Sequence, residues 1–318
     1  MSRWRTLRFD FTAMASPCSL QLDGCDEPAM RQAASAAMAE VQRVEHAYSR
    51  YRDDSIVSRI NRAAGRGEWV AVVAETASLL DFADQLWHLS DGLFDITSGV
   101  LRRAWDFKTP RVPEPAALQA LLPCLGWPQV EREQTAEGMR VRLTRPGMEL
   151  DFGGFGKEYA ADRAAAVLHQ HGMSHALVNL GGDLHALGPR GLPELAGAPW
   201  LIAIQHPRPD AAQPDQPLAQ LALSRGGLAT SGDYERYFIH AGQRYCHILN
   251  PRTGWPVTHW QSVSVLAANA TAAGVLTTLA MLQGDTAAQA LHAQGVGYLA
   301  VRHDGLVLRS PSPESSRT

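Results

Sequence analysis

The chain has 318 residues, of which 45% are hydrophobic and 19% charged, and its formal net charge is −3 at pH 7. This composition is typical of a globular protein with a substantial core. The small negative charge gives no electrostatic reason to expect nucleic-acid binding. No apolar run approaches the roughly 20 residues of a membrane span, so we expect no membrane-spanning segment.

The cysteines also argue against a metal centre built on thiolates. Cys18, Cys25, Cys124 and Cys246 show no CxxC spacing and no histidine-rich neighbourhood, so a zinc site is not expected. Free thiols in a reducing compartment are the simpler interpretation. Because the first residues contain no apolar stretch of signal-peptide length, we expect a cytoplasmic protein.

Helices and strands alternate along the chain without a repeated strand–helix–strand rhythm. The first strands are expected at 9–22, around a turn near 15–17, and a pair is expected at 139–143 and 148–152. Apolar residues at helical spacing predict helices at 28–48, 76–89, 113–122, 155–169, 272–283 and 286–293. Further strands are expected at 176–180, 200–206, 217–223, 236–240, 243–248 and 262–267, with a final hairpin near 304–305. Segment 208–216 is expected to be a surface loop. Strands grouped with packed helices favour an α+β fold.

The segment 230–257, TSGDYERYFIHAGQRYCHILNPRTGWPV, is the most informative stretch. It combines an expected polar turn at 230–233, an aromatic strand, a second strand ending in His247, and a loop bounded by proline and glycine at 250–254. Hydroxyls, a carboxylate, an imidazole and a guanidinium therefore converge in one hairpin-like unit. Such a density of polar groups on strands favours a functional site over plain surface.

A second segment, LDFGGFGKEYAADRAA at 150–165, is expected to be a strand ending in Asp151, two glycines and a helix. Free N–H groups at a helix N-terminus can bind phosphate. From this pattern alone, a glycine turn that holds no ligand is favoured over a binding site. It is neither a Walker loop nor a GxGxxG dinucleotide motif.

Three other motifs have local structural alternatives. In SDGLFDITSGVL (90–101), Asp95 could bind a ligand or cap a helix. The double glycine of VNLGGDLHALG (178–188) could form a bulge or a tight turn. In YSRYRDDSIVSRIN (48–61), Ser55 could be a helix cap.

Taken in order, these blocks resemble the ApbE family across nearly the whole chain. The resemblance rests on 14–17, SRYRDDSIVSRIN, GLFDIT, LDFGGFGKEYAAD, LVNLGGDLHALG, TSGDYERYF and HILNPRTGWPV. It implies an α+β ApbE-like fold with mixed or antiparallel sheets and packed helices, as a single domain over 1–309, followed by a disordered tail at 310–318. It also implies a FAD:protein FMN transferase, which uses Mg²⁺ to cleave FAD, attaches FMN by a phosphoester to a Thr or Ser of a target flavoprotein, and releases AMP.

The resemblance assigns roles residue by residue. The positions that match FAD-contacting residues of the family are Met14, Tyr51, Leu93, Phe94, Asp95, Asp151, Lys157 and Ile248. Gly154 matches a position whose carbonyl binds the metal, and Thr277 and Thr278 end the metal motif. His247 matches the histidine near the reacting phosphate and would be the general base. From the residues alone, His247 could instead be a structural histidine, and Lys157 a solvated lysine of a first helical turn.

One departure concerns the metal motif. The family carries an Asp in a segment like ADALATAL, whereas this chain has AAGVLTTLAML at 272–282, with Gly274 at the carboxylate position. Mg²⁺ prefers oxygen ligands, commonly including carboxylates, so we expect weakened metal binding before FAD arrives. Asp151, the pyrophosphate or water could compensate. A second change, Glu158 in place of a common Gly, is interpreted as a choice on the helix surface.

Three functions therefore stay open at this point. The first is FMN transfer to a flavoprotein. The second is a pyrophosphatase that splits FAD into FMN and AMP, with water replacing the protein hydroxyl. The third is a non-catalytic protein that binds or delivers FAD, which the loss of the carboxylate at Gly274 would allow.

Overall fold

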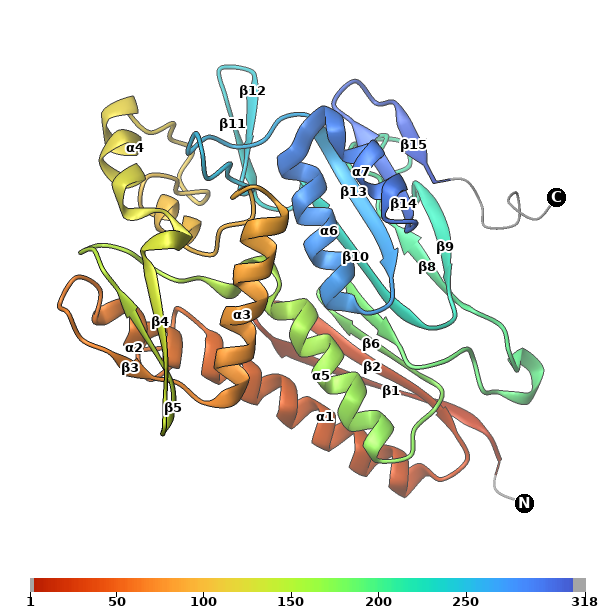
Figure 1. Cartoon of the computed structure of the whole chain (residues 1–318). Coiled ribbons are helices and arrows are strands. Elements are labelled where there is room, and N and C mark those ends of the chain that lie inside the picture. Colours follow the sequence, from red (N-terminus) through yellow and green to blue (C-terminus); the bar gives the residue numbers. More distant parts are fainter. Residues whose placement is uncertain (1–2, 311–318) are drawn as a thin grey trace.

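An eight-stranded antiparallel sheet forms the centre of the computed structural model, which describes residues 3–310 (Figure 1). Its strands lie in the order β1 (Arg5–Ala13), β2 (Ser16–Gly24), β6 (Ala176–Leu180), β7 (Asp183–Ala186), β10 (Gly226–Gly232), β13 (Trp260–Ala267), β14 (Gly297–Arg302) and β15 (Val307–Arg309). Three smaller sheets are β3 (Val70–Ala71) with β5 (Gly138–Leu143) and β4 (Val130–Thr135), β8 (Trp200–Ile204) with β9 (Ala219–Leu223), and β11 (Tyr237–His240) with β12 (Gln243–Cys246). The predicted α+β class with antiparallel sheets is confirmed.

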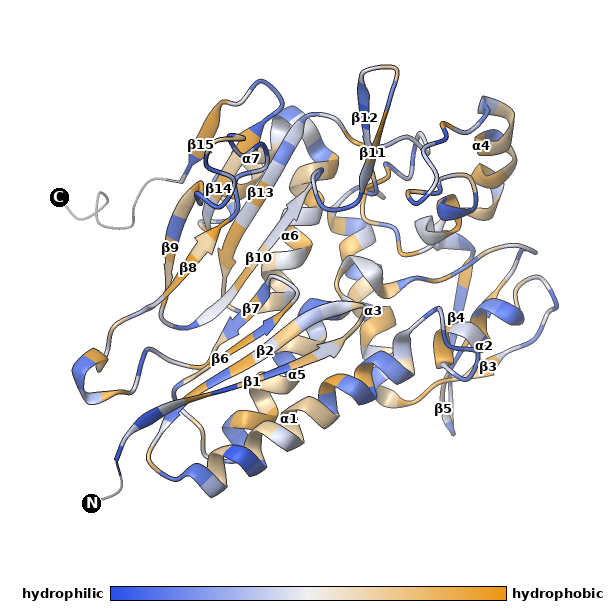
Figure 2. Ribbon diagram, turned by 180° about the vertical axis from the view of Figure 1, so that it is seen from behind, coloured by the Kyte–Doolittle hydropathy of each residue, from blue (hydrophilic) through white to orange (hydrophobic). Residues whose placement is uncertain are grey.

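Three long helices cover one face of the large sheet. Helix α5 (Gly156–Gln170) packs between α1 (Glu27–Tyr48) and α6 (Ala270–Gln283) (Figure 1). Seen from behind, the sheet lies in front of α5 and α6 (Figure 2). Buried alanines occupy the facing surfaces of α1 and α5, at 33, 34 and 37 and at 160, 161, 164 and 165. Such small side chains let two helix backbones approach closely, which builds a continuous core between the helices and the sheet.

The other helices lie around this layer. They are α2 (Ile56–Arg62), α3 (Ala74–Leu89), α4 (Pro115–Leu121) and α7 (Ala287–Ala293). Ser55 caps α2, because its hydroxyl accepts a hydrogen bond from the Ser58 N–H at 3.0 Å. Within residues 3–310, no helix has both the length and the apolar character needed to cross a membrane.

The carboxylate of Asp162 joins α5 to two neighbouring elements. It accepts hydrogen bonds from the backbone N–H groups of Ala270 (2.8 Å) and Thr271 (2.9 Å) at the start of α6. Its Oδ1 also lies 2.6 Å from Nδ1 of His185 on β7. Burial alone would raise the pKa of Asp162, but these hydrogen bonds outweigh it, so the pKa lies below its usual value. Asp162 therefore fixes the start of α6 against α5 and the sheet.

Most predicted elements are confirmed, with ends shifted by a few residues. Of the two alternatives for Gly181 and Gly182, the tight turn is confirmed by their positive φ angles. Segment 208–216 lies between β8 and β9 and is largely exposed, as expected. The predicted tail at 310–318 lies outside the described residues, apart from Ser310.

The predicted strand at 148–152 is wrong. Strand β5 pairs with β3 and β4 instead, neither of which was expected. The backbone near Leu150 is bound by the side chain of Asn61, which donates to the Leu150 carbonyl (3.0 Å) and accepts from its N–H (2.7 Å). The N–H of Asp151 donates to the Ile96 carbonyl at 2.9 Å. An amide side chain and a loop therefore satisfy the polar groups that a neighbouring strand would otherwise pair.

The predicted polar turn at 230–233 is also wrong for its first three residues. Thr230, Ser231 and Gly232 are the last residues of β10, which lies between β7 and β13 in the large sheet. The Thr230 and Ser264 hydroxyls are 2.8 Å apart across the β10–β13 pair. Polar residues can occupy this inner strand because their hydroxyls find partners on its neighbours.

The hydrogen bonds of Asp162 predict that the protein becomes less stable when the charge of this carboxylate is removed. We expect Asp162→Asn to lower the free energy of unfolding by about 2 kcal/mol, because the amide replaces a charged acceptor shared by several donors. Urea denaturation measures this change. The folded-state pKa lies below the unfolded-state value near 4, so the stabilisation is present above about pH 4 and lost as pH falls through the folded-state pKa.

The variant should consequently lose less stability than the unmodified protein on acidification. Asp304→Asn is the control, since Asp304 pairs with Arg302 on an exposed turn. An Asp162→Asn protein as stable as the control would contradict the assigned role.

Candidate functional site

A cavity of about 840 Å³ lies among segments that are far apart in the sequence. Its wall includes the start of α5, the end of β10, the β11–β12 hairpin and the 3-10 turn Ser98–Arg103. Residues predicted from the sequence that line it are Tyr51, Leu93, Phe94, Asp95, Asp151, Gly154, Lys157, His247, Ile248 and Thr278. The fold thus brings most of the predicted positions to one cavity.

Two predicted residues do not line this cavity. Met14 lies in the β1–β2 turn with a φ of 52°, and its partly buried side chain packs against the core. Thr277 is buried inside α6, where its hydroxyl donates to the Gly274 carbonyl at 2.8 Å. The same hydroxyl lies 2.9 Å from that of Ser231. Thr277 therefore lies directly behind the cavity wall, through its contact with Ser231.

His247 follows β12 and is held by one backbone carbonyl. The backbone N–H of His247 donates to the Arg236 carbonyl at 3.0 Å. The Nδ1 atom of the His247 ring lies 3.2 Å from the same carbonyl oxygen. Because a carbonyl can only accept, Nδ1 carries the hydrogen and Nε2 keeps a free lone pair. Burial, helped by the positive charges of Arg236 and Lys157, lowers the pKa of His247 to about 4. The imidazole is therefore neutral near pH 7 and can accept a proton.

Lys157, in the first turn of α5, forms an ion pair inside the cavity. Its Nζ lies 2.9 Å from Oδ2 of Asp183, whose side chain is buried. Burial opposes the charged form of Lys157, but the Asp183 carboxylate raises the pKa above its usual value. The interpretation of Lys157 as a simply solvated lysine is wrong. The cation is held at a fixed point beside the β6–β7 turn.

The two predicted aspartates are engaged by nearby groups. Asp95 accepts from the N–H (2.8 Å) and hydroxyl (2.6 Å) of Thr97 and from the Trp127 N–H (3.0 Å). Asp151 accepts from the Gly153 N–H at 2.9 Å and forms an ion pair with Arg50. Both carboxylates therefore fix the loops that form the cavity wall.

Tyr51 is the most exposed aromatic residue of the cavity wall. The residue is 76% exposed, and the Arg50 guanidinium lies 4.8 Å from the ring centre. One face of such a ring remains available to stack on a planar ligand.

Several cavity residues were not singled out from the sequence. Asp183 and Arg236 lie inside the matched blocks GGDL and YERYF, so their position in those motifs was the available signal. Glu158 was assigned to the helix surface, and this is wrong: it is 8% exposed and faces the cavity. Burial raises the pKa of its carboxyl well above the usual value, with a further contribution from Asp183. Helical periodicity could not reveal the burial of Glu158, because that burial depends on which elements pack against α5.

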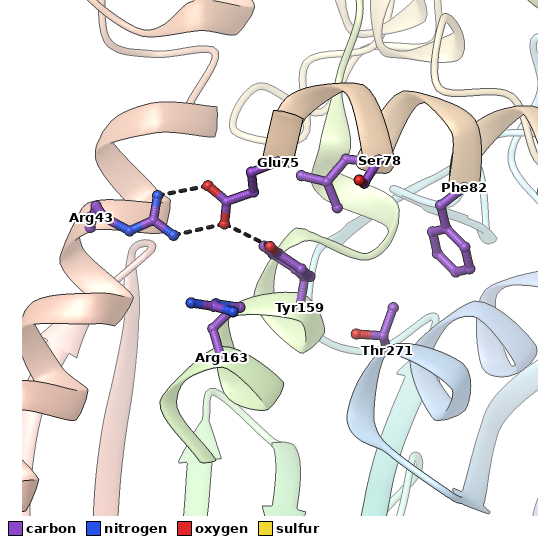
Figure 3. Close-up of a pocket in the computed structure, with 8 residues that line it drawn as sticks. Arg43, Glu75, Ser78, Phe82, Tyr159, Arg163 and Thr271 are labelled. Carbon is purple, nitrogen blue, oxygen red and sulfur yellow. Dashed lines mark hydrogen bonds and ion pairs between the residues drawn. The ribbon is translucent and has the colours of Figure 1, made fainter. Parts of the chain in front are cut away.

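A second cavity, of about 610 Å³, lies against α3 and α5 (Figure 3). Glu75 accepts hydrogen bonds there from Arg43 (2.7 and 2.8 Å) and from the Tyr159 hydroxyl (2.6 Å). Hydrogen bonding to Arg43 is the main cause that lowers the pKa of Glu75 to about 2. The charged groups satisfy one another, so this cluster holds α1, α3 and α5 together and presents no free group for chemistry.

Oxygen atoms dominate the donors available for a metal ion in the first cavity. Glu158, Thr230, Ser231 and Thr278 all contribute to its wall. Across residues 3–310, His, Cys, Asp and Glu side chains form no group of three or more that could hold a metal ion.

Fold and cavity together define an α+β protein in which a neutral histidine, a paired lysine and several hydroxyls share one site. A model of the ApbE family matches residues 14–301, and the chain belongs to that family. It is 33% identical over 282 residues to a FAD:protein FMN transferase of Klebsiella pneumoniae (strain 342), with 88% of this chain and 83% of that protein covered. A Treponema pallidum protein of the same name is 34% identical over 263 residues, covering 78% of this chain and 72% of that protein.

Solved structures agree with this assignment. An ApbE protein of Thermotoga maritima superposes with a TM-score of 0.86 at 30% identity, over 99% of this chain and 100% of the other. The apo flavinyl transferase ApbE of Pseudomonas stutzeri gives a TM-score of 0.81 at 27% identity, over 97% and 95% of the two chains. The ApbE-like fold is therefore established for the described residues.

The Lys157–Asp183 pair predicts a specific stability effect. We expect Lys157→Met to lower the free energy of unfolding by about 2 kcal/mol, because it leaves the buried Asp183 carboxylate without its partner. Chemical denaturation at pH 7 measures the loss. Adding Asp183→Asn should recover part of it, since no unpaired charge then remains buried.

Lys108→Met is the matched control, because Lys108 lines the same cavity but is exposed and forms no ion pair among the described residues. Equal destabilisation by Lys157→Met and Lys108→Met would show that the ion pair has no structural role.

Proposed function

We propose that this protein is a FAD:protein FMN transferase, which cleaves FAD, attaches FMN by a phosphoester to a Thr or Ser of a target flavoprotein, and releases AMP. The observation that carries the proposal is the orientation of His247. Its Nδ1 is bound to the Arg236 carbonyl, so its lone pair is free in the cavity that Lys157 also lines. The names of the relatives support the same activity.

His247 acts as the general base toward the incoming hydroxyl. A Thr or Ser hydroxyl is a weak nucleophile, and removal of its proton as it attacks phosphorus makes the reaction faster. A neutral imidazole with a free Nε2 can take that proton. The Arg236 carbonyl keeps the ring in the required tautomer and stabilises the protonated form that results.

The basic residues of the cavity bind the pyrophosphate of FAD. The positive charges of Arg236 and Lys157 both act on His247, because both lower its pKa. Arg236 forms no ion pair with any described carboxylate, so its guanidinium is available to phosphate oxygens. Tyr51, at the exposed edge of the cavity, offers its ring for stacking on a planar part of FAD. Leu93, Phe94 and Ile248 supply apolar contacts, as their positions in the cavity wall allow.

The oxygen-rich wall fits a magnesium ion that accompanies FAD. A magnesium ion held there would supply positive charge to offset the negative charge of the pyrophosphate during transfer. The Gly154 carbonyl and the Thr278 hydroxyl belong to residues of the cavity wall and would hold it, with Thr277 behind them. The buried Glu158 oxygen Oε2, which has no hydrogen-bond partner among the described residues, is consistent with a cation at this wall.

Other expectations remain proposals. We infer that residues 1–309 form one transferase domain, since the family model spans 14–301. A Ser/Thr-bearing flavoprotein as acceptor follows from the proposed reaction. Contacts of FAD with Met14, Asp95 and Asp151, and a cytoplasmic location, stay predictions.

The proposal is tested by incubating the protein with FAD, Mg²⁺ and a Thr-bearing peptide from a flavoprotein. We expect covalent FMN on the peptide by mass spectrometry, and AMP in equal amount. His247→Ala should reduce the transfer rate by about 10²-fold or more, because the base is lost, while FAD binding measured by fluorescence changes little. Free FMN without adduct would instead indicate a pyrophosphatase, and intact bound FAD a delivery protein.

The pKa of His247 predicts the pH dependence of transfer. The base is active when neutral, which is above its pKa, so activity falls only as pH drops toward about 4. We expect kcat/KM for FAD to differ by less than about twofold between pH 7.5 and pH 5.5. A histidine with an ordinary pKa near 6.5 would lose about tenfold over this range. An acid limb centred near pH 6.5 would contradict the proposed environment of His247.

A further inference from the structure

Glu158 has a surrounding that is unusual for a carboxylate. It lies in the first turn of α5, is 8% exposed and contributes to the cavity wall. Its Oε2 has no hydrogen-bond partner among residues 3–310, and Glu158 forms no ion pair within them. A buried carboxylate without a partner costs several kcal/mol when charged. The negative charge of the Glu158 carboxylate must therefore be neutralised, either by a proton or by a cation that binds in the cavity.

Helix α6 has a glycine, Gly274, at the point where the Glu158 side chain packs against it. A Cβ built on Gly274 would lie 2.3 Å from Oε1 of Glu158 and 2.5 Å from its Cγ. Only glycine leaves room at position 274 while Glu158 occupies this place. The Glu158 carboxylate thus fills the volume that a side chain on α6 would otherwise take, and the two positions form a reciprocal pair.

The groups around Glu158 favour a cation over an anion. Its chain neighbour Lys157 is already paired with the Asp183 carboxylate at 2.9 Å, so the lysine charge is not free to compensate that of Glu158. The hydroxyl-bearing residues Thr230, Ser231 and Thr278 belong to the same wall. Carboxylate and hydroxyl oxygens are ligands that Mg²⁺ and Mn²⁺ accept, together with phosphate oxygens.

We propose that Glu158, on α5, supplies the protein carboxylate for the divalent cation that binds with FAD, in place of a carboxylate from α6. This inference rests on the proposed function, because the FAD pyrophosphate provides the remaining anionic oxygens. Gly274 is then part of the same arrangement: it makes room for the ligand from α5. In this arrangement the acidic side chain of the metal site comes from α5 and the space for it from α6.

The test measures metal binding directly. Mn²⁺ is titrated into protein saturated with FAD, without acceptor, and free Mn²⁺ is followed by electron paramagnetic resonance. We expect Glu158→Gln, which keeps shape and removes charge, to weaken Mn²⁺ binding by at least about tenfold. FAD affinity in the presence of EDTA should stay within about twofold of the unmodified protein. Glu137→Gln, on the exposed β4–β5 turn, is the control and should leave Mn²⁺ affinity unchanged.

Mn²⁺ affinity of Glu158→Gln within about twofold of the unmodified protein would overturn the inference, as would absence of Mn²⁺ binding by the unmodified FAD complex. The proposed function fails separately, by absence of covalent FMN on the acceptor peptide. A protein that transfers FMN while Glu158→Gln still binds Mn²⁺ normally would therefore refute only the role of Glu158.

A second measurement tests the packing without any ligand. Gly274→Ala should lower the melting temperature when Glu158 is present, because the new Cβ meets its carboxylate. In a Glu158→Gly background the same change should cost much less, since the space is then free. Equal losses in both backgrounds would overturn the reciprocal pairing on which the inference depends.

Discussion

The carboxylate of Asp162 is the contact on which the arrangement of the cavity depends. It binds the first N–H groups of α6 and the His185 imidazole of β7 while its own backbone belongs to α5. These hydrogen bonds fix how α6 is rotated about its own axis and how far it is shifted along α5. Four residues before Asp162, one helical turn away, lies Glu158, and four residues after Ala270 lies Gly274. These two meet because Asp162 sets the register between the helices, and the wall of the cavity follows from that register.

The titratable residues of the cavity differ in whether their polar atoms have partners. Most have partners: Lys157 binds Asp183 and Arg50 binds Asp151, so that these groups hold the loops as well as facing the cavity. His247 and Glu158 each keep one atom without a partner. A histidine lone pair can accept a proton, and a carboxylate oxygen can bind a cation. The chemistry proposed for the site therefore depends on these two atoms, together with the Arg236 guanidinium, which forms no ion pair with any described carboxylate.

Helix α5 shows how much of this can be predicted. Its extent was predicted from apolar spacing, because burial against a core imposes a period of 3.6 residues. Apolar spacing could not predict which part of the protein each side of α5 would contact. Tyr159 faces the cluster with Glu75 (Figure 3), whereas Glu158 faces the cavity of about 840 Å³. Likewise, a strand at 148–152 was a reasonable prediction that failed, since Asn61, 89 positions before Leu150, binds its backbone in place of a strand.

The sequence by itself determined the fold class, the family and a set of site residues most of which line the cavity, because these depend on local periodicity and on ordered motifs such as GLFDIT and HILNP. Only the tertiary structure decided the tautomer of His247, the partner of Lys157 and the burial of Glu158. Each of these depends on one atom of a distant segment: the Arg236 carbonyl for the histidine, the Asp183 carboxylate for the lysine, and the missing Cβ of Gly274 for the glutamate. Contacts of this kind arise from packing between elements, which no pattern along a single chain encodes.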